Sequence, residues 1–361
     1  MTEFIQLHML ASYPPANLNR DDLGRPKTAI MGGTQRLRVS SQSLKRAWRA
    51  SEFFQEGLAG HMGIRTREMG SRIFTALTSG KTLKDVIDRN DAAPVRSPVD
   101  EKTATKWAAA IAGVFGKVKK DSVNLEQLVH FSIDEIQAID DLLERCVANN
   151  QDPKDEDLDL IRYNKSASDI AMFGRMLAAS PAYNMEAAVQ VAHALSVHDV
   201  VVEDDFFTAV DDLNTGEEDM GSAHMGEIEF ASGLFYLYLC INRDQLIENL
   251  GGDEDLANRS IAALTEAAAK IGPGGKQATF ASRAYASYIR AERGTQQPRA
   301  LSVAFLKPVK GDDMLTSAID AMADTCERMD RVYGRCYDDA CILNAHTGEG
   351  SLDDLIRFVG P

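Results

Sequence analysis

"RLRVSSQSLKRAWRAS", residues Arg36–Ser51, is the stretch that says most about the fold of this chain. Its first part alternates apolar and cationic side chains, with Leu37 and Val39 on one face, which predicts a strand. Ser41 or Ser43 can then cap a helix that starts near Ser43. The spacing i, i+3, i+4, i+7 of a packed helix face follows at Leu44, Ala47, Trp48 and Ser51. The stretch therefore predicts a strand that leads directly into an amphipathic helix.

The same stretch is the most basic part of an acidic chain. The 361 residues include 39 Lys and Arg against 54 Asp and Glu, a formal net charge of -15. Between Asn19 and Arg49, eight cations stand against two anions, so the local charge is +6 and the remainder carries -21. This asymmetry predicts an anionic partner for this segment alone.

The position of the cations indicates what kind of anion would bind. In a helix that starts near Ser43, Lys45 and Arg46 fall in the first turn, where cations oppose the helix macrodipole unless an anion binds the free N–H groups. "MGGTQRLR" and "GPGGKQ" match neither common nucleotide-phosphate loop, which leaves an extended nucleic-acid backbone. A merely solvated cationic face, with Arg49 paired to Glu52, is the alternative.

The rest of the chain reads as strands at both ends with helices between them. "FIQLHML" and "EIEFASGLFYLYLCIN" predict strands, and "RALSVAFLKPV" is strand-like. Residues 11–33 are predicted as a long loop, and "NMEAAVQVAHALSVH" as a helix. This order predicts an α+β sheet domain interrupted by a helical lobe over residues 60–180.

Composition and motifs argue against several classes of protein. Five cysteines without a C-x-x-C pair are typical of reduced thiols in a cytoplasmic protein, and the start of the chain has no cationic leader. No apolar run is long enough to cross a bilayer, so no membrane partner is expected. The spacing of His193, His198 and His224 does not favour a metal site. No nucleophile–base pair is evident, so we expect neither an enzyme nor a cofactor.

Acidic pairs leave one alternative open. Asp21-Asp22, Asp204-Asp205 and Asp211-Asp212 could bind Mg²⁺ and support phosphodiester cleavage. Helix caps and solvated loops are the simpler interpretation of such pairs.

Five segments, in order along the chain, resemble the backbone subunit of the type I-E CRISPR surveillance complex, Cascade. They are "LNRDDLGRPKTAIMGGTQRLRVSSQSLKRAWR", "DIAMFGRM", "AHALSVHDVVVEDDFFTAVDDLN", "GSAHMGEIEFASGLFYLYLCIN" and "GKQATF". The resemblance spans nearly the whole chain, and its first segment is long and specific.

The resemblance implies a hand-shaped α+β protein whose palm has the RNA-recognition-motif (RRM-like, ferredoxin-like) fold, with a helical fingers insertion and a protruding thumb. The implied division is palm over 1–59, fingers over 60–180, a palm helix over 181–198, thumb over 199–227 and palm again over 228–361.

The resemblance also implies the partners and the contacts. Copies of the chain would stack as a filament along one CRISPR RNA, with other Cascade subunits and target DNA paired to the guide. The guide RNA, not a cofactor, would be the bound ligand, and the protein would grip its backbone and shape. The implied RNA-binding residues are Arg20, Lys27, Ser40, Gln42, Lys45, Arg46, Arg49, Met176 and Thr208. A metal-dependent RNA nuclease using thumb aspartates and a free-standing RNA-binding protein are the alternatives.

Overall fold

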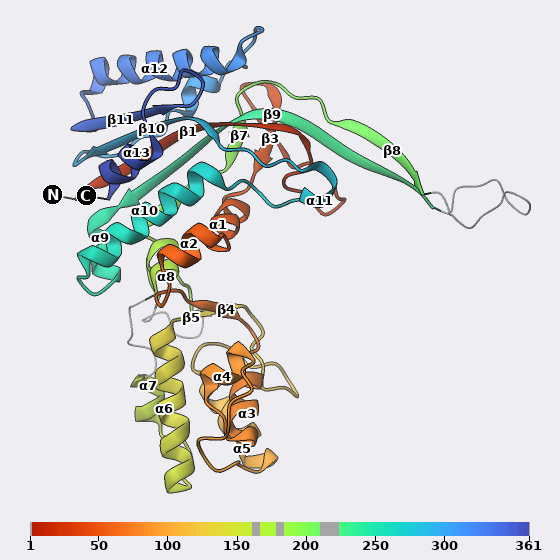
Figure 1. Ribbon diagram of the computed structural model, residues 1–361, viewed down its shortest axis with the longest axis vertical. Coiled ribbons are helices and arrows are strands. Elements are labelled where there is room, and N and C mark those ends of the chain that lie inside the picture. The colour runs from red at the N-terminus through yellow and green to blue at the C-terminus, as the bar shows by residue number, and fades with distance from the viewer. Residues whose placement is uncertain (1, 161–166, 178–183, 210–223, 361) are drawn as a thin grey trace, which may run out of the picture. The chain divides into compact units, whose positions relative to one another are not determined.

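The computed structural model describes residues 2–160, 167–177, 184–209 and 224–360 (Figure 1). The chain folds as two compact units. We call residues 1–56, 190–242 and 261–361 the sheet unit, and residues 57–189 and 243–260 the helical unit. Mixed helices and antiparallel strands confirm the predicted α+β class.

A long first strand forms the centre of the sheet unit. β1 (Phe4–Ala16) pairs antiparallel with β9 (His224–Asn242) on one side and with β10 (Ala286–Gly294) on the other. Strand order in the sheet is β11-β10-β1-β9-β7-β3-β2, where β11 is Asp339–Asn344, β7 is Ala194–Ser196, β3 is Thr34–Val39 and β2 is Thr28–Met31. Two further strands, β6 (Val189–Val191) and β8 (Glu203–Ala209), pair with β9. The strands predicted at "FIQLHML", at the start of "RLRVSSQSLKRAWRAS" and at "EIEFASGLFYLYLCIN" are thus confirmed.

Helices cover the sheet on both faces, which explains why β1 is buried almost continuously rather than at alternate residues. On one face, the helix α12 (Met314–Tyr333) and the 3₁₀ helix η2 (Ser302–Phe305) close a core with Leu10, Tyr236 and Tyr288. The other side carries α1 (Ser41–Arg49) and the part of α10 (Glu254–Lys270) that belongs to this unit (Figure 1). Shorter helices of this unit are α11 (Gln277–Phe280), α13 (Leu352–Val359) and most of α2 (Glu52–Gly57).

The helical unit has a core of its own. Its main helices, α3 (Met69–Ser79), α5 (Glu101–Gly113) and α6 (Ile133–Asn149), pack around buried residues such as Ile73, Trp107, Ile111 and Leu143. A two-stranded sheet joins β4 (Ile64–Thr66) to β5 (Val129–Phe131). The remaining helices are α4 (Leu83–Asp88), α7 (Asp155–Leu160), α8 (Ser168–Phe173) and α9 (Arg243–Asn249).

Three sequence predictions of secondary structure were wrong. In the described part of residues 181–198, the predicted helix is replaced by the strands β6 and β7, because these segments pair with β9 and, for β7, also with β3. "RALSVAFLKPV" forms η2 instead of a strand. Residues 11–33 are not one loop: β1 continues to Ala16, and β2 turns into β3 through Gly32 and Gly33, both at positive φ. Within the described residues, no helix is both long and apolar enough to cross a membrane.

Candidate nucleic-acid interface

The start of α1 differs from the prediction in one residue that matters. Ser40 is the N-cap, with its hydroxyl accepting a hydrogen bond from the Ser43 N–H at 3.3 Å, so neither Ser41 nor Ser43 caps the helix. The Ser40 N–H in turn donates to Asn19 Oδ1 at 2.9 Å. This bond fixes the loop after β1 to the beginning of α1.

The helix starts at Ser41, two residues earlier than predicted, which moves its cations away from the first turn. Arg46 and Arg49 lie in the last turn of α1, where the macrodipole favours cations, so the predicted cost of cations in a first turn was wrong. Leu44 and Trp48 form the buried face as predicted, and the Trp48 indole N–H donates to the carbonyl of Ile271 at 3.1 Å. Partial burial lowers the pKa of Lys45.

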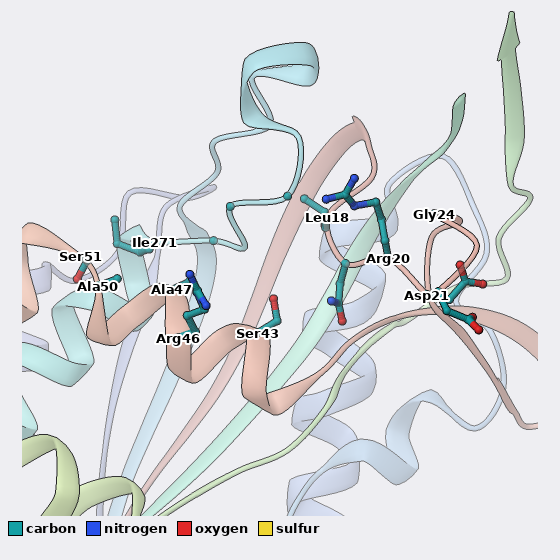
Figure 2. Close-up of a pocket in the computed structure, with 15 residues that line it drawn as sticks. Leu18, Arg20, Asp21, Gly24, Ser43, Arg46, Ala47, Ala50, Ser51 and Ile271 are labelled. Atoms are coloured by element: carbon teal, nitrogen blue, oxygen red, sulfur yellow. The ribbon is translucent and has the colours of Figure 1, made fainter. Parts of the chain in front are cut away.

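An open groove of about 840 Å³ runs beside α1 within the sheet unit. Figure 2 shows Ser43, Arg46, Ala47 and Ala50 on the helix side and Arg20 with Asp21 on the loop side. The segment from Ile271 to Gly275 completes the lining. We call this the α1 groove.

Hydrogen bonds of the loop over residues 18–27 hold Arg20 at the edge of the α1 groove. Asp21 Oδ1 accepts from the N–H groups of Leu23 and Arg25, both at 2.9 Å, and the Lys27 N–H donates to the Asn19 carbonyl at 2.8 Å. The Asp21 carboxylate therefore serves the turn, which is the simpler of the two interpretations of the Asp21-Asp22 pair.

Glycines let the opposite wall approach closely. A Cβ added to Gly275 would lie 2.4 Å from the carbonyl oxygen of Leu18 and 2.7 Å from that of Asn17. One added to Gly272 would lie 2.6 Å from the Tyr13 hydroxyl. The glycine-rich turn therefore allows backbone contact between two loops that both line the groove.

The predicted RNA-binding residues fall into three sets. Arg20 and Arg46 are exposed at the α1 groove, and Lys27 is half-buried nearby. Across the described residues, none of these three side chains has an ion-pair partner. Ser40 is buried at the cap, Gln42 is exposed, and Lys45 and Arg49 are half-buried on α1. Two lie elsewhere: Met176, which is 81% exposed, in the helical unit, and Thr208, exposed on β8 opposite Met225.

Two cations counted in the basic segment have structural roles. Arg36 is fully buried, and its guanidinium donates to the carbonyls of Ser196 at 3.0 Å and Phe305 at 2.9 Å. Arg25 pairs with Glu229 at 3.0 Å. Part of the local positive charge is thus already neutralised or bonded within the protein.

One pair near the site was missed by sequence reasoning. Arg38 Nη1 lies 2.9 Å from His193 Nδ1, although the two residues are 155 positions apart. The alternation of β3 marks Arg38 as a cation on the sheet, but no local signal places His193 beside it. His198 Nε2 accepts a hydrogen bond from the Leu234 N–H at 3.1 Å. Among the residues described, no three His, Cys, Asp or Glu side chains lie together in a way that could hold a metal ion.

Comparison with known proteins identifies relatives. A family model described as CT1975-like protein matches residues 5–355. A chain of a "CRISPR RNA-guided surveillance complex, pre-nicking" is 28% identical, with a TM-score of 0.80 over 99% of this chain and 100% of that chain. A chain of a second "CRISPR RNA-guided surveillance complex" is 24% identical, with a TM-score of 0.68 over 98% of this chain and 99% of that one, a likeness of fold alone. A search of curated proteins found no match.

Proposed function

This chain belongs to the family of CT1975-like proteins, and from that premise we propose that it is the backbone subunit of a type I-E CRISPR surveillance complex, Cascade. In this proposal several copies stack along one CRISPR RNA and hold it by its phosphate backbone. Each copy bends the guide and presents short segments for pairing with target DNA, while base pairing supplies the sequence specificity.

The α1 groove is the observation that carries the proposal. Arg20 and Arg46 face an open channel from two different segments, and within the described residues no carboxylate pairs with either. Cations kept without internal partners in an acidic protein favour an external polyanion. An open groove suits a sugar-phosphate chain that passes through, whereas a nucleotide site would be more enclosed.

The parts of a hand are assigned as part of the same proposal. The sheet unit is the RRM-like palm, the helical unit holds the fingers, and the ribbon of β8 with the start of β9 is the base of the thumb. The 28% identical chain, matched over its full length, supports this assignment. The thumb tip, including Asp211-Asp212, lies outside the described residues.

In this proposal the protein is not an enzyme, needs no cofactor and acts in the cytoplasm. Asp204 and Asp205 lie on β8 and are exposed. In the scaffold they solvate the ribbon; in the nuclease alternative they would bind Mg²⁺ and cut the RNA.

Salt dependence of RNA binding tests the groove. For a single strand, each phosphate contact contributes about -0.7 to the slope of log K against log salt concentration. Replacing two contacts, Arg20→Gln with Arg46→Gln, should make the slope shallower by about 1.4 and weaken binding. Fluorescence anisotropy with a labelled single-stranded RNA measures both.

A charge-matched control separates the groove from net charge. Lys102→Gln with Arg331→Gln removes two exposed cations, one on α5 and one on α12, neither of which lines the groove. The control should keep the wild-type slope. Equal slopes for the groove variant and the wild type would show that RNA does not use the α1 groove.

A further inference from the structure

Lys27, Arg38 and His193 form a second basic group near the open edge of the sheet. Arg38 lies on β3, with its backbone N–H bonded to the Lys27 carbonyl at 2.8 Å, so the two residues are neighbours across the strand pair. His193 lies between β6 and β7 and places Nδ1 2.9 Å from Arg38 Nη1. Lys27 and Arg38 also line one small cavity of about 10 Å³.

The Arg38–His193 contact fixes the protonation of the imidazole in the free protein. A guanidinium only donates, so Nδ1 must accept, and the single proton of the neutral ring is on Nε2. Partial burial, then Arg38 and then Lys27, lower the pKa of His193 below its usual value. Among the described residues, these two cations are the charged groups that act on this pKa.

Three potential cations are therefore held together without a carboxylate that acts on the histidine. In the free protein the neutral His193 ring accepts from Arg38, but a protonated ring would be repelled by Arg38 and Lys27. A phosphate removes the repulsion, because its oxygens can accept from the guanidinium, the ammonium and a protonated imidazole together.

We propose that Lys27, Arg38 and His193 form a proton-linked phosphodiester site that binds the single-stranded RNA entering or leaving the α1 groove. This inference rests on the proposed function and adds Arg38 and His193 to the contacts. In the free protein, Arg38 donates to the neutral His193 ring. In the complex, Arg38 turns to the phosphate, and His193 takes up a proton on Nδ1 and donates to the same phosphate.

The sign of the pH dependence follows from linkage. An anion next to His193 raises its pKa in the complex above the lowered pKa in the free protein, so binding takes up a proton. Affinity for RNA should therefore rise as pH falls through the pKa of the complex, and level off below the pKa of the free protein. A difference of one pKa unit corresponds to at most about a tenfold change in Kd.

The experiment measures Kd for a single-stranded oligouridylate, whose bases do not titrate in this range, at about pH 8 and about pH 6. Wild-type protein should bind several-fold more tightly at the lower pH. His193→Gln, which keeps a neutral polar side chain, should lose the gain in affinity between the higher and the lower pH. Arg38→Gln should make the salt slope shallower by about 0.7. His346→Gln, an exposed histidine outside this group, is the matched control and should behave as wild type.

Outcomes distinguish this inference from the proposed function. If the wild type binds RNA and the Arg20 and Arg46 variant weakens binding, but His193→Gln keeps the full pH gain or Arg38→Gln keeps the wild-type slope, the second site is refuted and the groove stands. If the wild type binds no RNA, both the proposed function and the second site are contradicted. NMR of the imidazole Hε1 resonance gives an independent readout: the pKa of His193 should rise when RNA is added, and an unchanged pKa would overturn the proposal.

Discussion

At the scale of single residues, depth in the fold decides what an arginine does. Arg36 and Arg38 are two apart on β3 and look equivalent in the sequence. Arg36 is fully buried and bonded to two carbonyls, whereas Arg38 reaches His193 at the surface. Clustering of cations was predictable from the sequence. Which of them face solvent was not, because burial of Arg36 depends on Ser196 and Phe305, far away in the chain.

Gly275 gives a prediction at this scale. Gly275→Ala would bring a Cβ within 2.4 Å of the Leu18 carbonyl, so one wall of the α1 groove must move. We expect a loss of roughly 1–3 kcal/mol in the free energy of unfolding, as for other overpacked sites, together with weaker RNA binding. Urea unfolding and anisotropy measure the two effects.

The neighbouring residue provides the control for that substitution. A Cβ on Gly274 would meet nothing within 4 Å, so Gly274→Ala should be close to neutral in both assays. Similar behaviour of the two variants would mean that close approach of the loops does not shape the groove.

At the scale of elements, prediction succeeded where one pattern dominated and failed where two competed. The long apolar run of β9 and the strand–helix step from β3 to α1 were predictable from period and capping residues. "NMEAAVQVAHALSVH" contains many good helix formers, yet it supplies two strands, since pairing with β9 and β3 outweighs intrinsic propensity. Partners so distant in sequence leave no local signal.

A buried ionic network ties several of these elements together. Glu292 of β10 is fully buried, with Arg290 Nε at 2.7 Å, Arg299 Nη1 at 2.8 Å and His8 Nε2 of β1 at 3.5 Å. Arg299 also reaches Asp330 of α12 at 3.4 Å. Burial alone would raise the pKa of Glu292, but close contacts with His8, Arg299 and Arg290 hold it well below its usual range.

Glu292→Gln should destabilise the sheet unit by up to roughly 3–5 kcal/mol near neutral pH, because it leaves the partly buried guanidinium of Arg290 without its carboxylate and that of Arg299 with Asp330 alone. Because the pKa of Glu292 is lower in the folded protein than in the unfolded chain, its carboxylate stabilises the fold at pH values above the unfolded pKa of about 4.3. This stabilisation is lost as the pH falls below that value towards the folded pKa. The difference in the free energy of unfolding between the wild type and the variant should therefore become smaller in acid. In a Trp107→Phe background, Trp48 is the single remaining tryptophan and reports unfolding of the sheet unit.

Glu327→Gln, at an exposed position on α12, removes the same charge as a control and should change stability little. A Glu292→Gln protein as stable as this control would show that the network is not needed for the fold.

At the scale of the whole molecule, the proposed function explains why positive charge is concentrated at one groove of an otherwise acidic protein. A net charge of -15 discourages general coating of nucleic acid, while Arg20 and Arg46, which have no ion-pair partner in the part of the chain that the structure describes, remain available at the α1 groove. The family match covers residues 5–355, which is nearly the entire chain. The resemblance was recognisable from the first basic segment. The groove itself was not predictable from it, since the loop over 18–27 and the turn over 271–275 meet only in the folded chain.

The central claim is that this chain is a filament subunit on a guide RNA, and native mass spectrometry of the chain with its guide tests it most directly. The account predicts complexes in which the number of protein copies rises with RNA length. Arg20→Gln with Arg46→Gln should reduce that number, and the RNA mass should stay unchanged after incubation with Mg²⁺. One protein copy per RNA at every length would indicate a free-standing RNA-binding protein, and RNA cut at regular intervals would indicate a nuclease; either result would contradict the account.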